Sequence, residues 1–335
     1  MTGEKKYTYK DMASDQEVRW CPGCDDYVIL RSVQKALPEI GRNREDIVFI
    51  SGIGCSSRFP YYMNTYGIHG IHGRAAAIAT GVKLANPELS VWVITGDGDG
   101  LAIGGNHTIH VIRRNVDLNI ILFNNEIYGL TKGQFSPTSL LGQRTKSSPF
   151  GNIQPPFNPG ELVLGSNGRF FARVSGNSAK EMASIFIEAE KFKGAAFIEV
   201  LQNCVIFNDG AFDKYNDKKT RPDNQLYLEH GQKMIFGAER NKGLRLNGLK
   251  LEVVTIGENG ITEDDILVHD AHNPDPTLHF MLVRLESPIV TGIIRAVEEP
   301  TFDQRFTQQM EARMAAVKEM SFDEFVMAGE TFELE

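Results

Sequence analysis

The stretch VITGDGDGLAIGGNH, residues 93–107, decides the fold of this chain. It begins as an apolar, β-branched run, turns through Gly96-Asp97-Gly98 and continues with the spacing of a helix. A glycine turn between a strand and a helix directs backbone N–H groups and the positive end of the helix dipole at one spot, which suits a phosphate. Because Asp97 stands in the same turn and would repel a bare phosphate, we expect a divalent cation between the two.

Three more apolar runs have the same character, at residues 46–51, 118–124 and 195–201. Short runs that are almost continuously apolar are typical of strands buried on both faces, and such strands form parallel sheets. Helical patterns alternate with the strands, at residues 25–37, 73–84, 102–113 and 179–192. The alternation predicts a doubly wound α/β fold with a mainly parallel sheet. Pro38 and Gly41 are expected to end the first helix.

The remaining segments break this pattern. Residues 126–168 are rich in Gly, Pro, Ser and Asn, and a loop of this length is usually functional or disordered. The composition turns polar after residue 210, so we place a domain boundary there, with the site in residues 1–210. Residues 211–335 are expected to form an irregular C-terminal extension of unknown role, with a helix over 302–320. Residues 1–20 are expected to be an arm.

Composition excludes several classes of protein. The chain has 335 residues, with 35 Lys and Arg against 43 Asp and Glu, which gives a net charge of −8. A chain this acidic is poorly suited to bind the phosphates of duplex DNA, so we expect no nucleic-acid partner. No apolar run approaches the roughly 18 residues that span a bilayer, and the polar N-terminus does not resemble a secretory signal. We therefore expect a soluble, cytoplasmic protein with no membrane partner.

Asn125 is the second candidate ligand for the cation. It lies 28 residues after Asp97, in LFNNEIYG, at the end of the next predicted strand. Neighbouring parallel strands bring their carboxyl ends to the same edge of a sheet, so the two side chains can converge. Other motifs fit less well: a calcium loop would need an acid or amide in place of Leu101, and GIGCSS has Ser57 where a dinucleotide turn has its third glycine.

The four cysteines form a second set of candidate ligands. Cys55 follows the first predicted strand, Cys204 follows the last, and Cys21 and Cys24 form a CxxC pair. All four thiols can therefore meet near one edge of the sheet. A [4Fe–4S] cluster takes four thiolates. Zinc is the rival metal, although a structural zinc site usually has two CxxC pairs. The third possibility is that Cys55 and Cys204 only fill space in the hydrophobic core.

GDG followed by an NN pair 26 to 28 residues later resembles the diphosphate-binding motif of thiamine diphosphate enzymes. This resemblance implies that the Asp97 carboxylate, the Asn125 side chain and the Ile127 carbonyl hold Mg²⁺. It also implies that Gly96, Gly98 and Asp99 line the diphosphate.

The motifs together resemble the β subunit of the 2-oxoacid:ferredoxin oxidoreductases, and most closely the 2-oxoglutarate enzymes. They cover roughly residues 18 to 208: WCPGC (20–24), GIGCSSR (52–58), HGIHGRA (69–75), GDGDG (96–100), NNEIYGLTKGQFSPTS (124–139) and NC (203–204). One departure is Asp25, where the family commonly has a glycine after the second cysteine.

The resemblance implies a thiamine diphosphate-dependent, reversible oxidative decarboxylation of 2-oxoglutarate with coenzyme A, giving succinyl-CoA and CO₂. Electrons would pass through one [4Fe–4S] cluster on Cys21, Cys24, Cys55 and Cys204 to ferredoxin. The chain shows one diphosphate-type domain, so an α subunit carrying the pyrimidine-binding domain is expected, in a dimer of αβ units.

The resemblance also implies roles for single residues. Arg58 would bind the substrate carboxylate, since arginine suits bidentate carboxylate recognition, and His69 would be a second catalytic residue. Arg74 is a weaker candidate. Thr131, Gln134 and Ser136 would lie in a loop that closes over the cofactor. Further cofactor contacts are expected from Cys55, Ser56, His72, Gly129 and Leu130.

Three alternatives stay open on the sequence. A non-redox thiamine diphosphate decarboxylase subunit shares GDG and NN, and only the metal on the cysteines would distinguish it. A non-enzymatic electron-transfer or scaffold subunit would bind no thiamine diphosphate. Within the family, pyruvate or another 2-oxoacid is the rival substrate.

Overall fold

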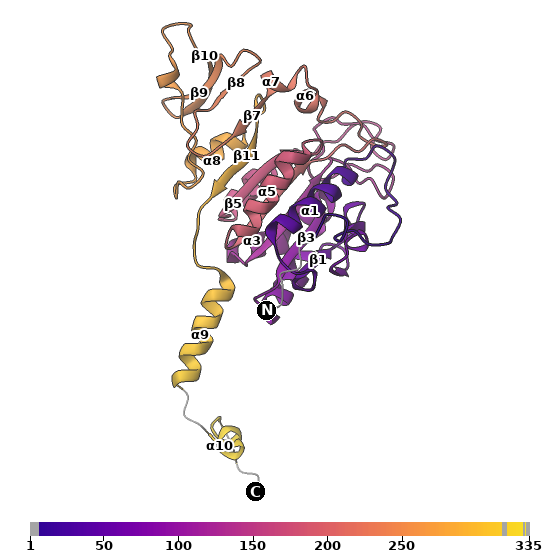
Figure 1. The fold of residues 1–335 in the computed structure, drawn as a ribbon, viewed down its shortest axis with the longest axis vertical. Coiled ribbons are helices and arrows are strands. Elements are labelled where there is room, and N and C mark those ends of the chain that lie inside the picture. Colours follow the sequence, from indigo (N-terminus) through magenta and orange to yellow (C-terminus); the bar gives the residue numbers. More distant parts are fainter. Residues whose placement is uncertain (1–6, 317–319, 331, 333–335) are drawn as a thin grey trace.

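An eight-stranded sheet forms the centre of the molecule (Figure 1). The structure, a computed structural model, describes residues 7–316, 320–330 and 332. The strand order is β2-β1-β3-β4-β6-β5-β11-β7, and all neighbours are parallel except β5 and β11. The strands are β1 (Ile47–Ser51), β2 (Tyr66–His69), β3 (Ser90–Gly96), β4 (Leu118–Asn124), β5 (Phe170–Ser175), β6 (Ala195–Leu201), β7 (Gln225–Leu228) and β11 (Ile289–Ala296). The predicted α/β class with a mainly parallel sheet is confirmed.

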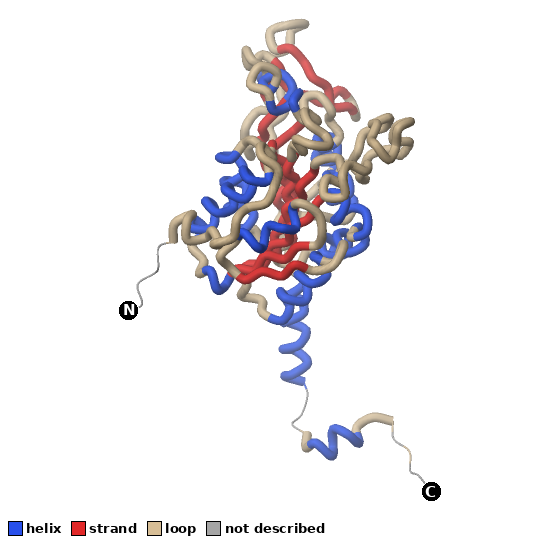
Figure 2. The backbone as a smooth tube through the Cα atoms, turned by 90° about the vertical axis from the view of Figure 1, so that its right-hand side faces the viewer, coloured by secondary structure: helices blue, strands red, loops and turns tan. Residues whose placement is uncertain are grey.

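Helices cover both faces of this sheet, as the edge-on view shows (Figure 2). One core packs α1 (Asp26–Ile40) and α5 (Ala179–Lys191) on one face. The other core packs α2 (Ala75–Ala85), α3 (Gly105–Arg114) and α4 (Pro159–Gly165) on the opposite face. The fold is therefore doubly wound.

Two helices differ from the prediction. α1 runs through Pro38 to Ile40 and ends at Gly41, whose φ of 81° allows its N–H to bond the Leu37 carbonyl at 3.1 Å. Pro38 removes one backbone hydrogen bond, and the helix continues for only two residues beyond it. The helix expected at 102–113 begins as a π-helical turn, Asp99–Ile103, before α3.

The C-terminal region contributes to the main sheet. β7 and β11 both lie beyond residue 210, and Val290 and Ile294 share a core with Phe171. The sheet therefore crosses the expected boundary. The rest of this region holds α6 (Asp213–Asn216), α7 (Arg221–Asn224), α8 (Thr277–Val283) and an antiparallel sheet of β8 (Ile235–Phe236), β9 (Lys242–Asn247) and β10 (Lys250–Thr255).

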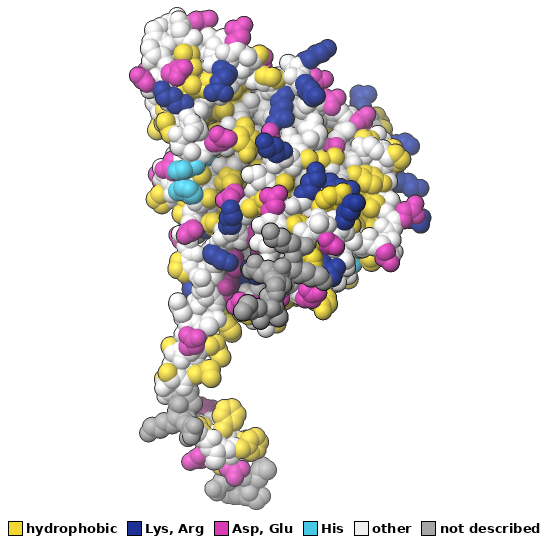
Figure 3. Space-filling model, viewed as in Figure 1, with side chains coloured by type: hydrophobic (Ala, Val, Ile, Leu, Met, Phe, Trp, Pro, Cys, Tyr) yellow, Lys and Arg dark blue, Asp and Glu magenta, His cyan; other side chains and the backbone are white. Residues whose placement is uncertain are grey.

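The two ends of the chain behave differently. Residues 7–20 are not a free arm, because Met12 and Trp20 are buried in the core with α1. α9 (Phe302–Ala316) and α10 (Phe322–Met327) extend away from the body and carry exposed apolar side chains (Figure 3). Part of the helix expected over 302–320, residues 317–319, lies outside the described residues. Among the helices that the structure describes, none has the length and apolar character needed to cross a membrane.

Candidate functional site

A cavity of about 140 Å³ opens at the carboxyl edge of the sheet, beside the ends of β1, β3 and β4. Because the chain places β2 on one side of β1 and β3 on the other, this is the switch point at which doubly wound folds bind ligands. All twelve residues predicted to contact a cofactor line the cavity: Cys55, Ser56, His72, Gly96, Asp97, Gly98, Asp99, Asn125, Ile127, Gly129, Leu130 and Thr131.

Asp97 forms the acidic end of this cavity. Its carboxylate is buried, and Oδ2 lies 2.5 Å from Ser136 Oγ and 2.6 Å from Thr138 Oγ1. Burial raises the pKa of Asp97 to about 6, against the lowering effect of these hydroxyls. Asn125 and Ile127 line the same cavity, and Asn125 Oδ1 accepts the Ile127 N–H at 3.2 Å. A carboxylate, an amide oxygen and a backbone carbonyl are the oxygen ligands that Mg²⁺ takes.

Buried carboxyl groups support a cation at this end. Burial, together with the nearby Asp97 and Glu199 carboxylates, raises the pKa of Glu126 to about 8. Glu199 is paired with Arg173 at 2.7 Å, whereas the side chains that bond Asp97 are the uncharged hydroxyls of Ser136 and Thr138. A divalent cation would stabilise the ionised form of Asp97, and the residues present therefore fit Mg²⁺ with a diphosphate.

Asp99 lines the cavity, but its oxygens already have partners. Oδ1 accepts the Gly73 N–H at 2.6 Å and Oδ2 accepts the Thr95 hydroxyl at 2.7 Å. A Cβ on Gly52 would lie 2.1 Å from Oδ2, which shows how closely the segment after β1 approaches. Asp99 therefore fastens neighbouring segments around the glycine turn.

Tyr128 is a cavity residue that sequence reasoning missed. Its ring packs on Gly98, where a Cβ would lie 2.2 Å from Tyr128 Cε1, and its hydroxyl donates to the Gly98 carbonyl at 2.9 Å. This contact explains the second glycine of GDG, because no larger residue fits against the ring. Tyr128 belongs to the NNEIYG motif (124–129), but an aromatic residue in a loop does not by itself indicate a function.

The four cysteines come from segments that meet beside the cavity, and all are free thiols. A methyl group on Gly129 would lie 3.5 Å from Cys204 Sγ and 3.6 Å from Cys55 Sγ. Burial, with smaller contributions from Asp26 and the thiols of Cys204 and Cys21, raises the pKa of Cys55 to about 12. Burial also raises the pKa of Cys24, with smaller contributions from Asp26, Cys204 and Cys55.

Asp25, the departure from the family pattern, links two of the cysteine segments. Its Oδ2 accepts the Asn203 N–H at 2.9 Å, next to Cys204, and Gln202 Nε2 donates to Cys24 Sγ at 3.2 Å. The Trp20 ring N–H donates to the Cys55 carbonyl at 2.7 Å, which ties in the third segment. Four thiols on mutually bonded segments fit a four-thiolate cluster. Within the described residues, no three His, Cys, Asp or Glu side chains are grouped so as to hold a single metal ion.

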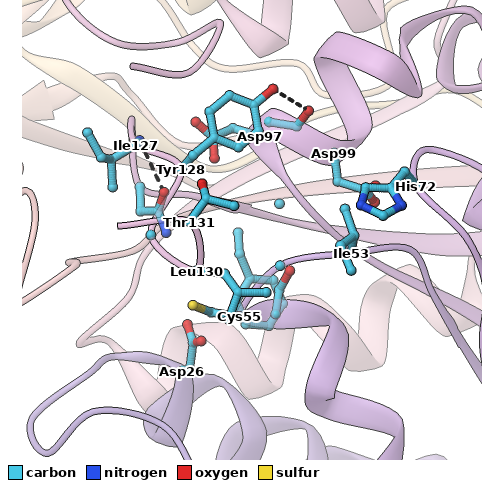
Figure 4. A pocket seen from close by; sticks show the side chains of 17 residues that line it. Asp26, Ile53, Cys55, His72, Asp97, Asp99, Ile127, Tyr128, Leu130 and Thr131 are labelled. Carbon is cyan, nitrogen blue, oxygen red and sulfur yellow. Dashed lines mark hydrogen bonds between the residues drawn. The ribbon is translucent and has the colours of Figure 1, made fainter. Parts of the chain in front are cut away.

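Residues of the two candidate centres lie at opposite ends of one cavity (Figure 4). Asp97, Ile127 and Tyr128 lie at one end, and Cys55 lies at the other beside Asp26. Asp26 was also missed by the sequence analysis. Its carboxyl is buried, and burial raises its pKa to about 7. A ligand that spans the cavity would therefore touch the cation end and the thiol end at once.

The predicted substrate residues lie outside the cavity lining. Arg58 is half-buried and its Nε donates to the Tyr62 hydroxyl at 3.0 Å. His69 ends the edge strand β2, with Nδ1 3.0 Å from the Tyr61 hydroxyl, and Arg74 Nη1 lies 3.4 Å from the Ile103 carbonyl. In the long loop, Gln134 bonds Thr131 and Ser136 bonds Asp97, so the loop is held against the cavity.

Comparisons with known proteins agree with this geometry. Residues 52–200 match the model of the thiamine pyrophosphate enzyme C-terminal TPP-binding domain. The 2-oxoglutarate oxidoreductase subunit KorB of Mycobacterium tuberculosis is 51% identical over 90% of this chain and 82% of that protein. The β subunit of 2-oxoacid:ferredoxin oxidoreductase 1 of Aeropyrum pernix is 47% identical over 57% of this chain and 60% of that one.

A solved structure matches almost the whole chain. The 2-oxoglutarate:ferredoxin oxidoreductase from Magnetococcus marinus, with 2-oxoglutarate, coenzyme A and succinyl-CoA bound, gives a TM-score of 0.79 at 30% identity over 98% of both chains. The chain therefore belongs to the 2-oxoacid:ferredoxin oxidoreductase family, as a β subunit of an enzyme that also has an α subunit.

Proposed function

We propose that this chain, with its α partner, catalyses the reversible oxidative decarboxylation of 2-oxoglutarate with coenzyme A, giving succinyl-CoA, CO₂ and reduced ferredoxin. The observation that carries the proposal is one cavity with oxygen ligands at one end and the Cys55 thiol at the other, where Cys204 lies beside the cavity residue Gly129. The names of the similar proteins from Mycobacterium tuberculosis and Magnetococcus marinus support 2-oxoglutarate as the substrate.

The proposal includes two cofactors at this cavity. Asp97, Asn125 and the Ile127 carbonyl would hold Mg²⁺ and, through it, the diphosphate of thiamine diphosphate. Cys21, Cys24, Cys55 and Cys204 would hold one [4Fe–4S] cluster. When bound, thiamine diphosphate supplies the electron sink for losing CO₂ from a 2-oxoacid, and the cluster accepts electrons one at a time.

The remaining residues shape and close the site. Tyr128 and Gly98 form one wall, and their hydrogen bond fixes the glycine turn that faces the diphosphate. Ser136 and Thr138 anchor the long loop on Asp97, which keeps water from the buried carboxylate. Gly129 lines the cavity next to the Cys55 and Cys204 thiols, and its lack of a side chain would allow a cofactor to approach them.

The proposal includes further partners. The α subunit would supply the pyrimidine-binding domain, and αβ units would pair into a dimer. Ferredoxin would accept the electrons near the cysteines, of which Cys21 is exposed. Four free thiols are typical of proteins in a reducing compartment, so we propose a cytoplasmic location.

The deciding experiment measures iron, acid-labile sulfide and thiamine diphosphate in the αβ complex purified without oxygen. We expect about four iron atoms and four sulfides per β chain if the α partner carries no cluster. We also expect reduction of ferredoxin that needs both 2-oxoglutarate and coenzyme A. Zinc in place of iron, or turnover without ferredoxin, would overturn the proposal in favour of a non-redox decarboxylase.

Arg58 and His69 remain proposals for substrate recognition. Arg58 lies close enough to Cys55 to lower its thiol pKa, which places the guanidinium near the thiol end of the cavity. If Arg58 binds the distal carboxylate of a dicarboxylic substrate, Arg58→Ala will raise KM for 2-oxoglutarate far more than for pyruvate. Equal effects on the two substrates would remove Arg58 from this role.

A further inference from the structure

A chain of buried polar side chains leads from the middle of the sheet to Asp97. Arg173 on β5 donates from Nε to Glu199 Oε2 on β6 at 2.7 Å, and the two side chains are only 4% and 2% exposed. Asn124, the last residue of β4, donates from Nδ2 to Glu199 Oε1 at 2.8 Å. Three neighbouring strands thus contribute one residue each.

The long loop completes the connection. Thr138 Oγ1 lies 2.8 Å from Asn124 Oδ1 and 2.6 Å from Asp97 Oδ2. Its hydroxyl proton is shared between these two acceptors, so the Asn124 carbonyl oxygen helps to orient the hydroxyl, and Ser136 donates a second hydroxyl to the same Asp97 oxygen. All five side chains of this hydrogen-bonded network, from Arg173 to Asp97, are buried, so water does not compete for these contacts.

Glu199 fixes the orientation of the Asn124 amide group. A carboxylate only accepts hydrogen bonds, so Asn124 must turn its NH₂ group toward Glu199 and its carbonyl oxygen toward Thr138. Arg173 holds that carboxylate in place from the other side. Stability alone does not explain such a pair, because a buried ion pair is often no more stabilising than apolar residues of the same volume.

We propose that Arg173 and Glu199 act as positioning residues which, through Asn124 and Thr138, fix the side chain of Asp97 for cation binding. The inference rests on the proposed function, in which Asp97 is a ligand of Mg²⁺. Arg173, Glu199, Asn124 and Thr138 are absent from the lining of the described cavity, so they act through Asp97. An ordered carboxylate binds a cation more tightly because less side-chain entropy is lost on binding.

The test uses the αβ complex stripped of cation and thiamine diphosphate, with Mn²⁺ as the probe. Free Mn²⁺ is counted by electron paramagnetic resonance in the presence of thiamine diphosphate. We expect Thr138→Val to weaken Mn²⁺ binding about tenfold, the effect of one lost charge-assisted hydrogen bond. The half-saturating Mg²⁺ concentration should rise by the same factor, while kcat at saturating Mg²⁺ is retained.

Two variants separate positioning from a general loss of structure. Thr138→Ser keeps the hydroxyl and should restore Mn²⁺ binding to within about twofold. Thr108→Val is the matched control, because the Thr108 hydroxyl is also buried but donates to the Gly100 carbonyl at 2.7 Å and has no bond to Asp97. It should leave Mn²⁺ affinity unchanged.

Asn124→Leu removes the hydrogen bonds of Asn124 to Glu199 and Thr138. It replaces Thr138→Val in the test if that variant does not fold. The double variant should bind Mn²⁺ no more weakly than the worse single variant, since both remove the same path. Unchanged Mn²⁺ affinity in the folded single variants, or fully additive losses, would overturn the inference alone. An unmodified complex that binds neither Mn²⁺ nor thiamine diphosphate would overturn both this inference and the proposed function.

Discussion

At the scale of single residues, Gly98 is the position where one added methyl group has the clearest consequence. An ideal Cβ there would lie 2.2 Å from the Tyr128 ring, which is far inside van der Waals contact. The ring would have to move to make room for the methyl group. We predict that Gly98→Ala displaces Tyr128, breaks its 2.9 Å bond to the residue 98 carbonyl and lowers thiamine diphosphate occupancy severalfold. The measurement is the thiamine diphosphate content of the purified complex, normalised to β chain.

Gly105 supplies the control in the same glycine-rich stretch. A Cβ at Gly105 meets nothing within 4 Å, and its φ is not in the left-handed region. Gly105→Ala should therefore bind thiamine diphosphate as the unmodified complex does. Equal occupancy in the two variants would show that the Gly98–Tyr128 contact does not shape the cofactor site.

Residue types that carry chemistry were predictable from the sequence, and residues that act through distant partners were not. Asp97 and Asn125 stood at the ends of recognisable strands, so their meeting in one cavity followed from sheet geometry. Thr138 lies 41 residues from Asp97, and no local pattern connects the two. Asp25 looked like a loss of the family's glycine, while its bond to the Asn203 N–H gives it a role of its own.

At the scale of elements, uniform burial decided which strands could be predicted. β4 and β6 are buried at every position, and each contains at least four apolar residues in a row or around a single polar one, so both were recognisable as strands. β5 is equally buried but contains Arg173, whose charge interrupts the run and is balanced by Glu199 on the next strand. β2 is exposed at all four positions, so it carried no apolar pattern at all.

The segment that packs on β11 should make folding stability depend on pH. His269 is buried, bonds the Ile293 carbonyl through Nε2 at 2.9 Å, and its pKa is lowered to about 4, mainly by burial. Within that shift, the bond to the Ile293 carbonyl and the Asp270 carboxylate oppose burial, while His279 and His230 act in the same direction as burial. The folded state thus binds a proton less readily than the unfolded chain, whose histidine has a pKa of about 6.5. Stability from this group is present above pH 6.5 and is lost as pH falls toward 4.

We predict that His269→Gln, which cannot take up the proton, flattens this loss. Urea denaturation of the complex at pH 7.5 and at pH 5 measures the free energy of unfolding under the two conditions. The unmodified protein should lose on the order of 1–2 kcal/mol between the two conditions through this group, and the variant clearly less. If both proteins lose the same stability, burial of His269 does not control the acid sensitivity.

At the scale of the whole molecule, composition and topology divide the chain differently. The polar stretch after residue 210 marks a change of composition. The later strands β11 and β7 nevertheless belong to the main sheet, where β11 pairs with β5 and β7 pairs with β11. A strand that pairs with a partner more than a hundred residues earlier leaves no trace in local composition. α9 and α10, in contrast, extend away from the body (Figure 1).

Two truncations should behave oppositely for this reason. A chain ending at residue 210 loses Leu226, Leu228, Val290 and Ile294, all buried, and at about 1.5–3 kcal/mol each their burial contributes roughly 6–12 kcal/mol. That is comparable with the whole stability of a typical domain, so we expect no folded protein. A chain ending at residue 320 loses, among the described residues, only exposed ones, and its melting temperature in the complex should stay within about 2 °C. Soluble yield and circular dichroism melting of both, co-expressed with the α partner, measure this; a folded 1–210 chain would mean that β7 and β11 are dispensable and that the sheet is complete without them.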